Sequence, residues 1–176
     1  TYARAGEGGT GAAKCGGNYA ASMIAQTEGE KHGCKQVIFK DPHRGDAIEE
    51  LGGMNVFFVF GKENKIVTPE LTGTILEGVT RSSLIQLAKD RGMTVEERAI
   101  TLTEWREGVA NGDITEIFAC GTAAVVAPIG KLKAEDFEIP APTEHFGEIS
   151  KSLREELVGI QTGVVEDRHG WLTRLI

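Results

Sequence analysis

Cysteine and histidine, which supply most protein metal sites and all disulfides, are scarce in this 176-residue chain. The three cysteines, Cys15, Cys34 and Cys120, are odd in number and far apart, and no Cys-x-x-Cys pair occurs. This pattern excludes a disulfide framework and a cysteine zinc site and predicts reduced thiols. The four histidines show no ligand spacing either, so we expect no metal site.

A net positive charge and long apolar runs are lacking as well. The net charge is −7 and the sequence pI is about 5.2, which argues against nucleic acid as a partner. No apolar run approaches the length of a membrane span, and no signal-peptide pattern is present. Hydrophobic residues make up 40% of the chain, enough for one domain with a core. We therefore expect a cytoplasmic protein without a membrane partner.

The most chemically distinctive stretch lies near the N-terminus, where Lys14 stands among glycines and alanines. Such small neighbours leave the amine open to a planar ligand, and lysine is the residue that forms Schiff bases with carbonyl compounds. Asn18 is a good helix N-cap, so a helix should begin at Tyr19. From local sequence alone, Lys14 could equally be a solvated surface lysine.

A second reading of the same region is a dinucleotide-binding loop. Residues 6–11 satisfy the Gly-x-Gly-x-x-Gly spacing and precede a helix. That fingerprint also needs a preceding strand and an acidic residue at the end of a strand about twenty residues later. Neither is present, because Glu28 and Glu30 fall within or at the end of the expected helix. We therefore reject this reading.

Hydrophobic periodicity predicts alternating helices and strands, and thus an α/β fold with a mixed sheet. The run Val-Phe-Phe-Val-Phe is apolar on both sides and should be a central, fully buried strand. The segment 131–146 should be a surface excursion, and Trp171 a packing anchor. We expect helices over 19–32, 80–91, 103–110 and 148–161, strands over 36–41, 56–60, 66–68, 93–100, 114–120 and 125–129, and a hairpin tip over 61–65.

Two adjacent carboxylates, Glu49 and Glu50, lead into the apolar strand. Because side chains alternate along a strand, Glu50 should share the inward face of Ile48, and Glu49 should point the other way. A carboxylate that is buried needs a positive partner, and a pyridinium nitrogen is one. The pattern alone leaves open that both glutamates are exposed at the strand end.

Two further stretches could bind an anion. A helix that starts near Thr80 would present free backbone N–H groups, although Thr80 could also serve only as its cap. Arg81 in that first turn opposes the helix dipole, which nearby anions would relieve. The Gly-Thr-Ala-Ala corner at 121–124 offers a hydroxyl and unshielded N–H groups, or is simply a tight bend.

Four strings occur in one order along the chain: Gly-Gly-Thr-Gly-Ala-Ala-Lys-Cys-Gly-Gly-Asn-Tyr, Glu-Leu-Gly-Gly-Met-Asn-Val-Phe, Leu-Glu-Gly-Val-Thr-Arg and Gly-Thr-Ala-Ala. Together they closely resemble the branched-chain amino acid aminotransferases, pyridoxal-phosphate enzymes of fold-type IV. The similarity runs from about Thr10 to Trp171. It implies that residues 1–176 form the pseudo-barrel large domain, with the N-terminal small domain absent, so that the chain looks like the C-terminal portion of a longer enzyme.

The resemblance also assigns roles around a pyridoxal 5'-phosphate cofactor. Lys14 would form the internal aldimine and carry the proton, Tyr19 would bond the phenolic oxygen, and Glu50 would hold the ring nitrogen. The remaining matched residues would contact the ring, the phosphate or the substrate carboxylate: Leu76 the ring, Val79, Thr80 and Thr122 the phosphate, and Ala123 and Ala124 the carboxylate. The positions of a redox Cys-x-x-Cys found in some relatives hold Ala124 and Ala127, so no such switch is expected.

The implied reaction is reversible amino transfer between leucine, isoleucine or valine and 2-oxoglutarate, with 2-oxo acids and glutamate as the other partners and a homodimer as the full-length assembly. The chain alone should bind cofactor weakly and be inactive or weakly active, because relatives bind phosphate partly through an arginine in the missing portion. Alternatives are a D-amino acid aminotransferase, an aminodeoxychorismate lyase, or a non-catalytic fragment. The Glu-Leu-Gly-Gly-Met-Asn string argues against the first two.

Overall fold

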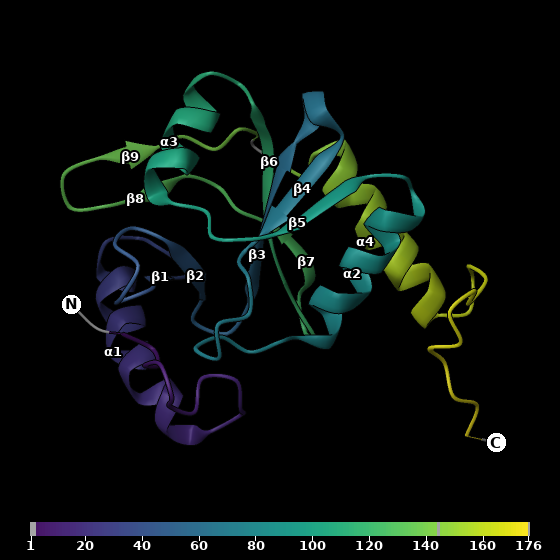
Figure 1. Ribbon diagram of the computed structural model, residues 1–176, viewed down its shortest axis with the longest axis horizontal. Coiled ribbons are helices and arrows are strands. Elements are labelled where there is room, and N and C mark those ends of the chain that lie inside the picture. Colours follow the sequence, from purple (N-terminus) through teal and green to yellow (C-terminus); the bar gives the residue numbers. More distant parts are fainter. Residues whose placement is uncertain (1–2, 144, 176) are drawn as a thin grey trace.

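The computed structural model describes residues 3–143 and 145–175, and its centre is a five-stranded mixed sheet (Figure 1). The strand order is β5-β4-β3-β6-β7, in which β4 and β5 are parallel and the other pairs are antiparallel. The strands are β3 (Asn55–Phe60), β4 (Lys65–Thr68), β5 (Thr94–Glu97), β6 (Ile114–Gly121) and β7 (Val125–Pro128).

Helices α2 (Val79–Asp90) and α4 (Glu148–Gln161) cover one face of this sheet, and α3 (Leu102–Ala110) lies on the other (Figure 1). Because side chains alternate along β3, the strand contributes to the cores on both faces of the sheet: Phe57 packs on the α2–α4 side, and Phe58 on the α3 side. Phe57 stacks on Phe118, and Phe58 meets Trp105 edge-on, each with ring centroids 5.1 Å apart. Every residue of β3 is buried, as its apolar sequence predicted.

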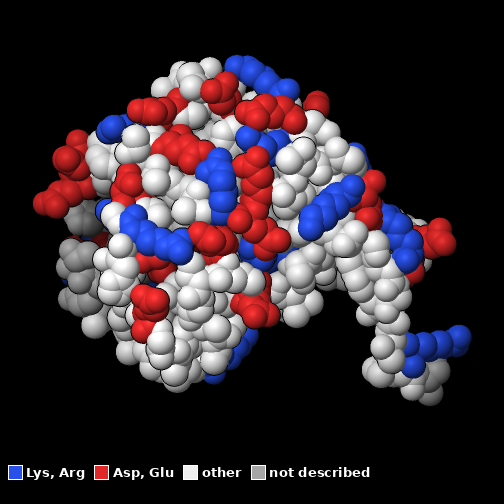
Figure 2. Space-filling model, in the orientation of Figure 1, with Lys and Arg blue, Asp and Glu red and all other residues white. Residues whose placement is uncertain are grey.

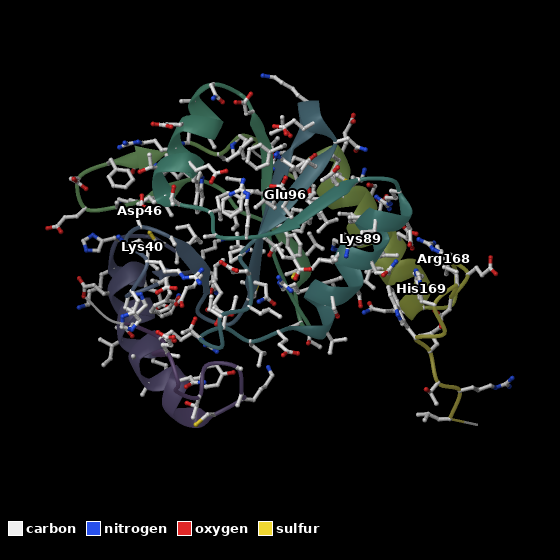
Figure 3. The ribbon with its side chains drawn as sticks, in the orientation of Figure 1. Lys40, Asp46, Lys89, Glu96, Arg168 and His169 are labelled. Carbon is white, nitrogen blue, oxygen red and sulfur yellow. The ribbon has the colours of Figure 1, made fainter. Side chains whose placement is uncertain are left out.

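A smaller N-terminal unit consists of α1 (Gly16–Lys31) and the hairpin of β1 (Ile38–Lys40) and β2 (Ile48–Leu51), which lie together in Figure 1. The hairpin joins the rest through Ile48, whose N–H donates to the carbonyl of Ile100 at 2.8 Å. The turn before β2 is held by Asp46, which accepts from the backbone N–H and hydroxyl of Thr103. Figure 3 shows Lys40 and Asp46 on the opposite side of the sheet from Arg168 and His169.

Most of the predicted elements are confirmed, and the errors lie at their ends. Helix α1 begins at Gly16 rather than Tyr19, and its N-cap is Cys15, so Asn18 is inside the helix. Helix α2 begins at Val79 with Gly78 as N-cap, so Thr80 does not cap it. The hairpin tip contains the short 3-10 helix η1 (Gly61–Glu63), followed by Asn64 in the left-handed conformation.

The segment 131–146 is less superficial than predicted. It contains a short hairpin of β8 (Leu132–Lys133) and β9 (Glu138–Ile139), and Ile139 is buried in the α3-side core. Residue 144 lies outside the described residues. Among the described residues, no helix has both the length and the apolar character needed to cross a membrane. On the face seen in Figure 2, acidic and basic side chains are interspersed.

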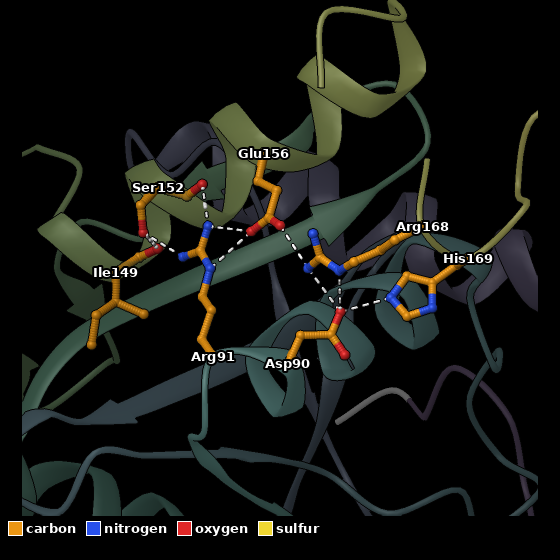
Figure 4. Close-up of polar contacts among 7 residues, drawn as sticks. All are labelled: Asp90, Arg91, Ile149, Ser152, Glu156, Arg168 and His169. Carbon is orange, nitrogen blue, oxygen red and sulfur yellow. Dashed lines mark hydrogen bonds and ion pairs between the residues drawn. The ribbon is translucent and has the colours of Figure 1, made fainter. Parts of the chain in front are cut away.

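A network of charged side chains attaches the C-terminal segment to α2 and α4 (Figure 4). Arg168 lies 2.7 Å from Asp90 of α2 and 2.7 Å from Glu156 of α4, and Asp90 also meets His169 at 2.6 Å. Trp171 stacks on His169 with centroids 4.7 Å apart but remains 38% exposed. Trp171 therefore packs locally on His169 and belongs to neither core cluster, so the prediction of a packing anchor holds only for this local contact.

We expect Asp90→Asn to loosen the attachment of residues 162–175 without unfolding the domain. Asp90 holds both Arg168 and His169, so the neutral amide weakens two charge-assisted contacts at once. His169, Gln86 and Arg168 hold the pKa of Asp90 well below its usual value, so the wild-type attachment should persist as pH falls through 3.8. Hydrogen exchange of the segment measures this. Glu155→Gln, at an exposed carboxylate of α4, should leave exchange unchanged.

Candidate functional site

Lys14 lies on a loop that is held in shape by Asn18, while Lys14 itself is exposed. The Asn18 amide donates to the carbonyls of Thr10 at 2.8 Å and Ala13 at 3.0 Å, and its oxygen accepts from the Thr10 hydroxyl at 2.7 Å. Asn18 is 4% exposed. Asn18, predicted as an N-cap, therefore acts as a clamp: its side chain holds the loop that carries Lys14 closed. Tyr19 follows Asn18 in the first turn of α1 and is partly buried.

Glu50 is buried, as predicted for the inward-facing carboxylate, and its positive partner in the structure is Arg4. An Nη1 atom of Arg4 lies 2.8 Å from Oε1 of Glu50, and each side chain is at most 3% exposed. Burial raises the pKa of Glu50 to about 7, against the opposing effects of Arg4, the Leu76 N–H and Lys14. Oε1 of Glu50 and Nε of Arg4 have no hydrogen-bond partner among the described residues.

Glu49, which was expected to point away from the inward face of Ile48 and Glu50, is also buried. The segment that follows β4 covers this side of β2, and the Thr74 hydroxyl donates to Oε1 of Glu49. Burial raises the pKa of Glu49 as well. The alternative that both glutamates are exposed is excluded, because each is under 5% exposed.

The predicted phosphate-binding segment, residues 76–80, which we call the cup, is held in place by Asn55, the first residue of β3. Its amide donates to the carbonyl of Leu76 at 2.9 Å, and its Oδ1 lies where a Cβ on Gly78 would come within 2.3 Å. Gly78 has a φ of +74°, so both its conformation and the contact require glycine. In the part of the chain that the structure describes, no side chain caps α2, which leaves the N–H groups at Val79 and Thr80 able to meet an anion.

Arg81 was expected to depend on a nearby anion to relieve its opposition to the helix dipole, and the structure shows protein partners for it. It is 2% exposed and donates to the carbonyl of Pro69 and to Glu97, each at 2.9 Å. Its guanidinium therefore joins the start of α2 to the end of β5. The interaction is long-range, and neither partner could be chosen from the local sequence.

The corner formed by residues 121–124 lies beside the cup because β6 pairs with β3. In this register Cys120 is opposite Asn55, so Thr122 follows at the same end of the sheet. Thr122 and Ala123 are exposed, Ala124 is half-buried, and Val125 adopts a φ of +56° after them. The tight bend is therefore real, and its hydroxyl and N–H groups are accessible.

These contacts connect three of the four segments that carry the motifs. The charge of Lys14 and the N–H of Leu76 both lower the pKa of Glu50. Asn55 links Leu76 to β3, which pairs with β6, the strand that leads into the corner. A cavity of about 180 Å³ lies elsewhere, on the Glu49 side of β2, where Thr74, His43 and Arg44 line it. Sequence reasoning missed Arg4, Asn18 as a clamp and Asn55, because their roles depend on contacts with other segments.

Comparisons with known proteins show the family of the chain. The family model for class IV amino-transferases matches residues 9–132. The branched-chain-amino-acid aminotransferase of Mycolicibacterium smegmatis is 52% identical over 176 residues, which are 99% of this chain and 48% of that protein. The enzyme of the same name from Mycobacterium tuberculosis H37Rv is 51% identical, with the same coverage. The chain thus spans about half the length of the curated relatives it matches.

Solved structures match the fold as well. The branched-chain amino acid aminotransferase from Thermobaculum terrenum, solved in its PLP-form, gives a TM-score of 0.79 at 31% identity, over 98% of this chain and 52% of that chain. The Escherichia coli branched-chain amino acid aminotransferase gives 0.74 at 32% identity, over 93% of this chain and 50% of that one. The predicted α/β fold with a mixed sheet, of the fold-type IV kind, is confirmed.

Proposed function

We propose, since the chain belongs to the class IV aminotransferase family, that it forms the cofactor-binding part of a branched-chain amino acid aminotransferase. The observation that carries the proposal is the buried Glu50 carboxylate, which has an unsatisfied oxygen and lies within electrostatic reach of Lys14. The Glu50 carboxylate could accept from a protonated ring nitrogen, and the Lys14 amine could react with an aldehyde on the same aromatic ring.

The residues present fit pyridoxal 5'-phosphate. Oε1 of Glu50, which Arg4 Nη1 approaches at 2.8 Å without making a hydrogen bond, can accept one from a ring N–H. The uncapped start of α2 at Val79 and Thr80 offers backbone donors to a phosphate, and the exposed hydroxyl of Thr122 can add to them. When bound, the cofactor supplies an electron sink for the bonds at the amino acid Cα.

The chain's own residues divide the remaining work. Lys14 Nζ would bind covalently to the aldehyde carbon of the cofactor. Once substrate displaces it, the same amine would accept and return the proton at the substrate Cα. Glu50 would keep the ring nitrogen protonated, Tyr19 would donate to the phenolic oxygen, and Leu76 would pack on the ring. The N–H groups at Ala123 and Ala124 would bind the substrate carboxylate, beside the exposed Thr122.

The finer assignments are proposals as well. We infer that the amino donors are leucine, isoleucine and valine, that 2-oxoglutarate accepts the amino group, and that the enzyme is a cytoplasmic homodimer. Residues 1–176 alone should bind the cofactor weakly and turn over little substrate, because Lys14 and Val79 are exposed to solvent. A rate from this chain alone equal to that of the full-length protein would contradict this inference.

The test is a substrate panel on the full-length protein supplied with pyridoxal 5'-phosphate. We expect kcat/KM for L-leucine, L-isoleucine and L-valine with 2-oxoglutarate to exceed that for D-alanine and L-aspartate by at least about 100-fold. Preference for D-amino acids would identify a different enzyme of the same family. Cofactor binding without amino transfer to any 2-oxo acid would contradict the proposal.

A further inference from the structure

Arg4 connects the segments that make up the proposed cofactor site. One nitrogen of its guanidinium, Nη1, lies 2.8 Å from Glu50 Oε1, 3.0 Å from the Thr74 carbonyl and 3.4 Å from the Gly11 carbonyl. Thr74 lies two residues before Leu76, and Gly11 three residues before Lys14. The side chain is almost fully buried. A single cation thus reaches the glutamate, the lysine segment and the segment that leads into the cup.

The lysine segment and the cup segment touch where Arg4 contacts them. A Cβ added to Gly11 would lie 2.1 Å from the Thr74 carbonyl oxygen, so the two backbones meet without any side chain between them. Buried carbonyl oxygens need a hydrogen-bond donor. Nη1 of Arg4 donates to both the Gly11 and the Thr74 carbonyl.

We propose that Arg4 is a positioning residue of the cofactor site, which keeps Glu50 ionised and aimed at the ring nitrogen and fastens the lysine segment to the cup segment. The proposal rests on the proposed function for its cofactor, but the ion pair and the two carbonyl contacts belong to the protein alone. Arg4 need not touch the cofactor for this role.

Charge explains why Glu50 needs such a partner. A carboxylate this deeply buried tends to take up a proton, and the neighbouring Glu49 adds to that tendency. The cations that oppose it are Arg4 first and Lys14 second. Asp41 raises and His43 lowers the pKa of Glu49, and the Thr74 hydroxyl donates a hydrogen bond to Glu49. These groups therefore belong to the same electrostatic neighbourhood. Without Arg4, Glu50 would become a neutral acid that cannot favour a protonated ring nitrogen.

The geometry also leaves a hydrogen-bond acceptor free for the ligand. Oε1 of Glu50 forms the ion pair but makes no hydrogen bond, and Nε of Arg4 is also without a partner among the described residues. Buried polar atoms are normally satisfied, so an open acceptor in a buried pair marks a place for another donor. Arg4 therefore orients Glu50 without saturating it.

The test begins with the protein free of cofactor, by measuring the free energy of unfolding from pH 4.5 to 9. Because the folded pKa of Glu50 is raised to about 7, this residue's contribution is present below pH 4.5 and is lost as pH rises through 7. Arg4→Gln should move this loss upward by at least about one pH unit, and Arg4→Lys should keep it near the wild-type position. Glu50→Gln should remove it.

The second measurement is the dissociation constant of pyridoxal 5'-phosphate for the full-length protein. Arg4→Gln should weaken binding at least tenfold and Arg4→Lys less, while Arg44→Gln, at an exposed arginine paired with Glu70, should have no effect. If Arg4→Gln does not fold, the double variant Arg4→Gln/Glu50→Gln replaces it, because removing both charges leaves none unpaired. In that case, restored folding in the double variant supports the pair, and continued failure to fold contradicts it.

The outcomes separate the two proposals. An unshifted pH dependence in Arg4→Gln, or wild-type cofactor affinity in both Arg4 variants, would overturn the role of Arg4. Failure of the unsubstituted protein to bind pyridoxal 5'-phosphate would overturn the proposed function, and the pH dependence of the cofactor-free protein would still decide whether Arg4 controls the charge of Glu50.

Discussion

Replacing Lys14 with alanine is expected to abolish the visible absorbance of bound pyridoxal 5'-phosphate and to stop amino transfer almost completely. The same amine would hold the aldehyde carbon and move the proton, so both roles are lost together. Loss of an acid–base group alone lowers rates by about 10²–10⁴-fold, which sets a lower limit for the effect on single-turnover rates. The loop should keep its shape, because Asn18 and not Lys14 closes it.

Lys62 is the matched control for Lys14. It lies on η1 at the far hairpin tip, is exposed, and pairs only with Asp113 at 3.2 Å among the described residues. Lys62→Ala should leave both the absorbance band and the turnover unchanged, since exposed ion pairs contribute little. Near-normal activity of the Lys14→Ala protein would mean that the reactive lysine has been assigned to the wrong residue.

The sequence predicted the central sheet well because its strands are specified locally. The run Val56–Phe60 is apolar on both faces, and only a strand covered on both sides can bury it. The stripe of Leu153, Leu157 and Ile160 likewise fixes the buried face of α4. These segments carry their own pattern, and their elements were correct to within a few residues.

Helix starts were predicted less well, for a physical reason. Asn18 has the composition of an N-cap, but its amide is more useful across the loop, where it satisfies the carbonyls of Thr10 and Ala13. At α2, Gly78 is required by the approach of Asn55, a residue 23 positions away in the sequence. A local rule cannot weigh such contacts, because they exist only after the chain has folded.

The residues proposed for the candidate site come from motifs in the sequence, whereas the residues that support them became visible only in the structure. Lys14, Glu50 and Leu76 belong to motifs that can be recognised in the sequence. Arg4 carries no local signal, since a single arginine before a glycine-rich stretch is usually solvated. Its burial depends on Glu50, 46 positions later, and on the Thr74 carbonyl. The supports could not be predicted, because each joins segments that are distant in sequence.

The second large effect is expected for Glu50→Gln. The neutral amide cannot favour a protonated ring nitrogen, so the chemical step should slow by on the order of 2–4 kcal/mol, as when one strong electrostatic contact is removed at a catalytic site. Arg4 would then be a buried cation without its partner, so some loss of stability should accompany the slower rate. Single-turnover rates with L-leucine measure the first effect, and urea unfolding the second.

Glu49→Gln is the matched comparison, because Glu49 is as deeply buried as Glu50 and differs in what it contacts. Its partner is the Thr74 hydroxyl, and the glutamine carbonyl oxygen can still accept that hydrogen bond. Burial already raises the pKa of Glu49, so removing the charge relieves desolvation instead of breaking an ion pair. The single-turnover rate should therefore change little in Glu49→Gln. A larger loss for Glu49→Gln than for Glu50→Gln would mean that the ring-binding carboxylate has been assigned one residue too late along β2.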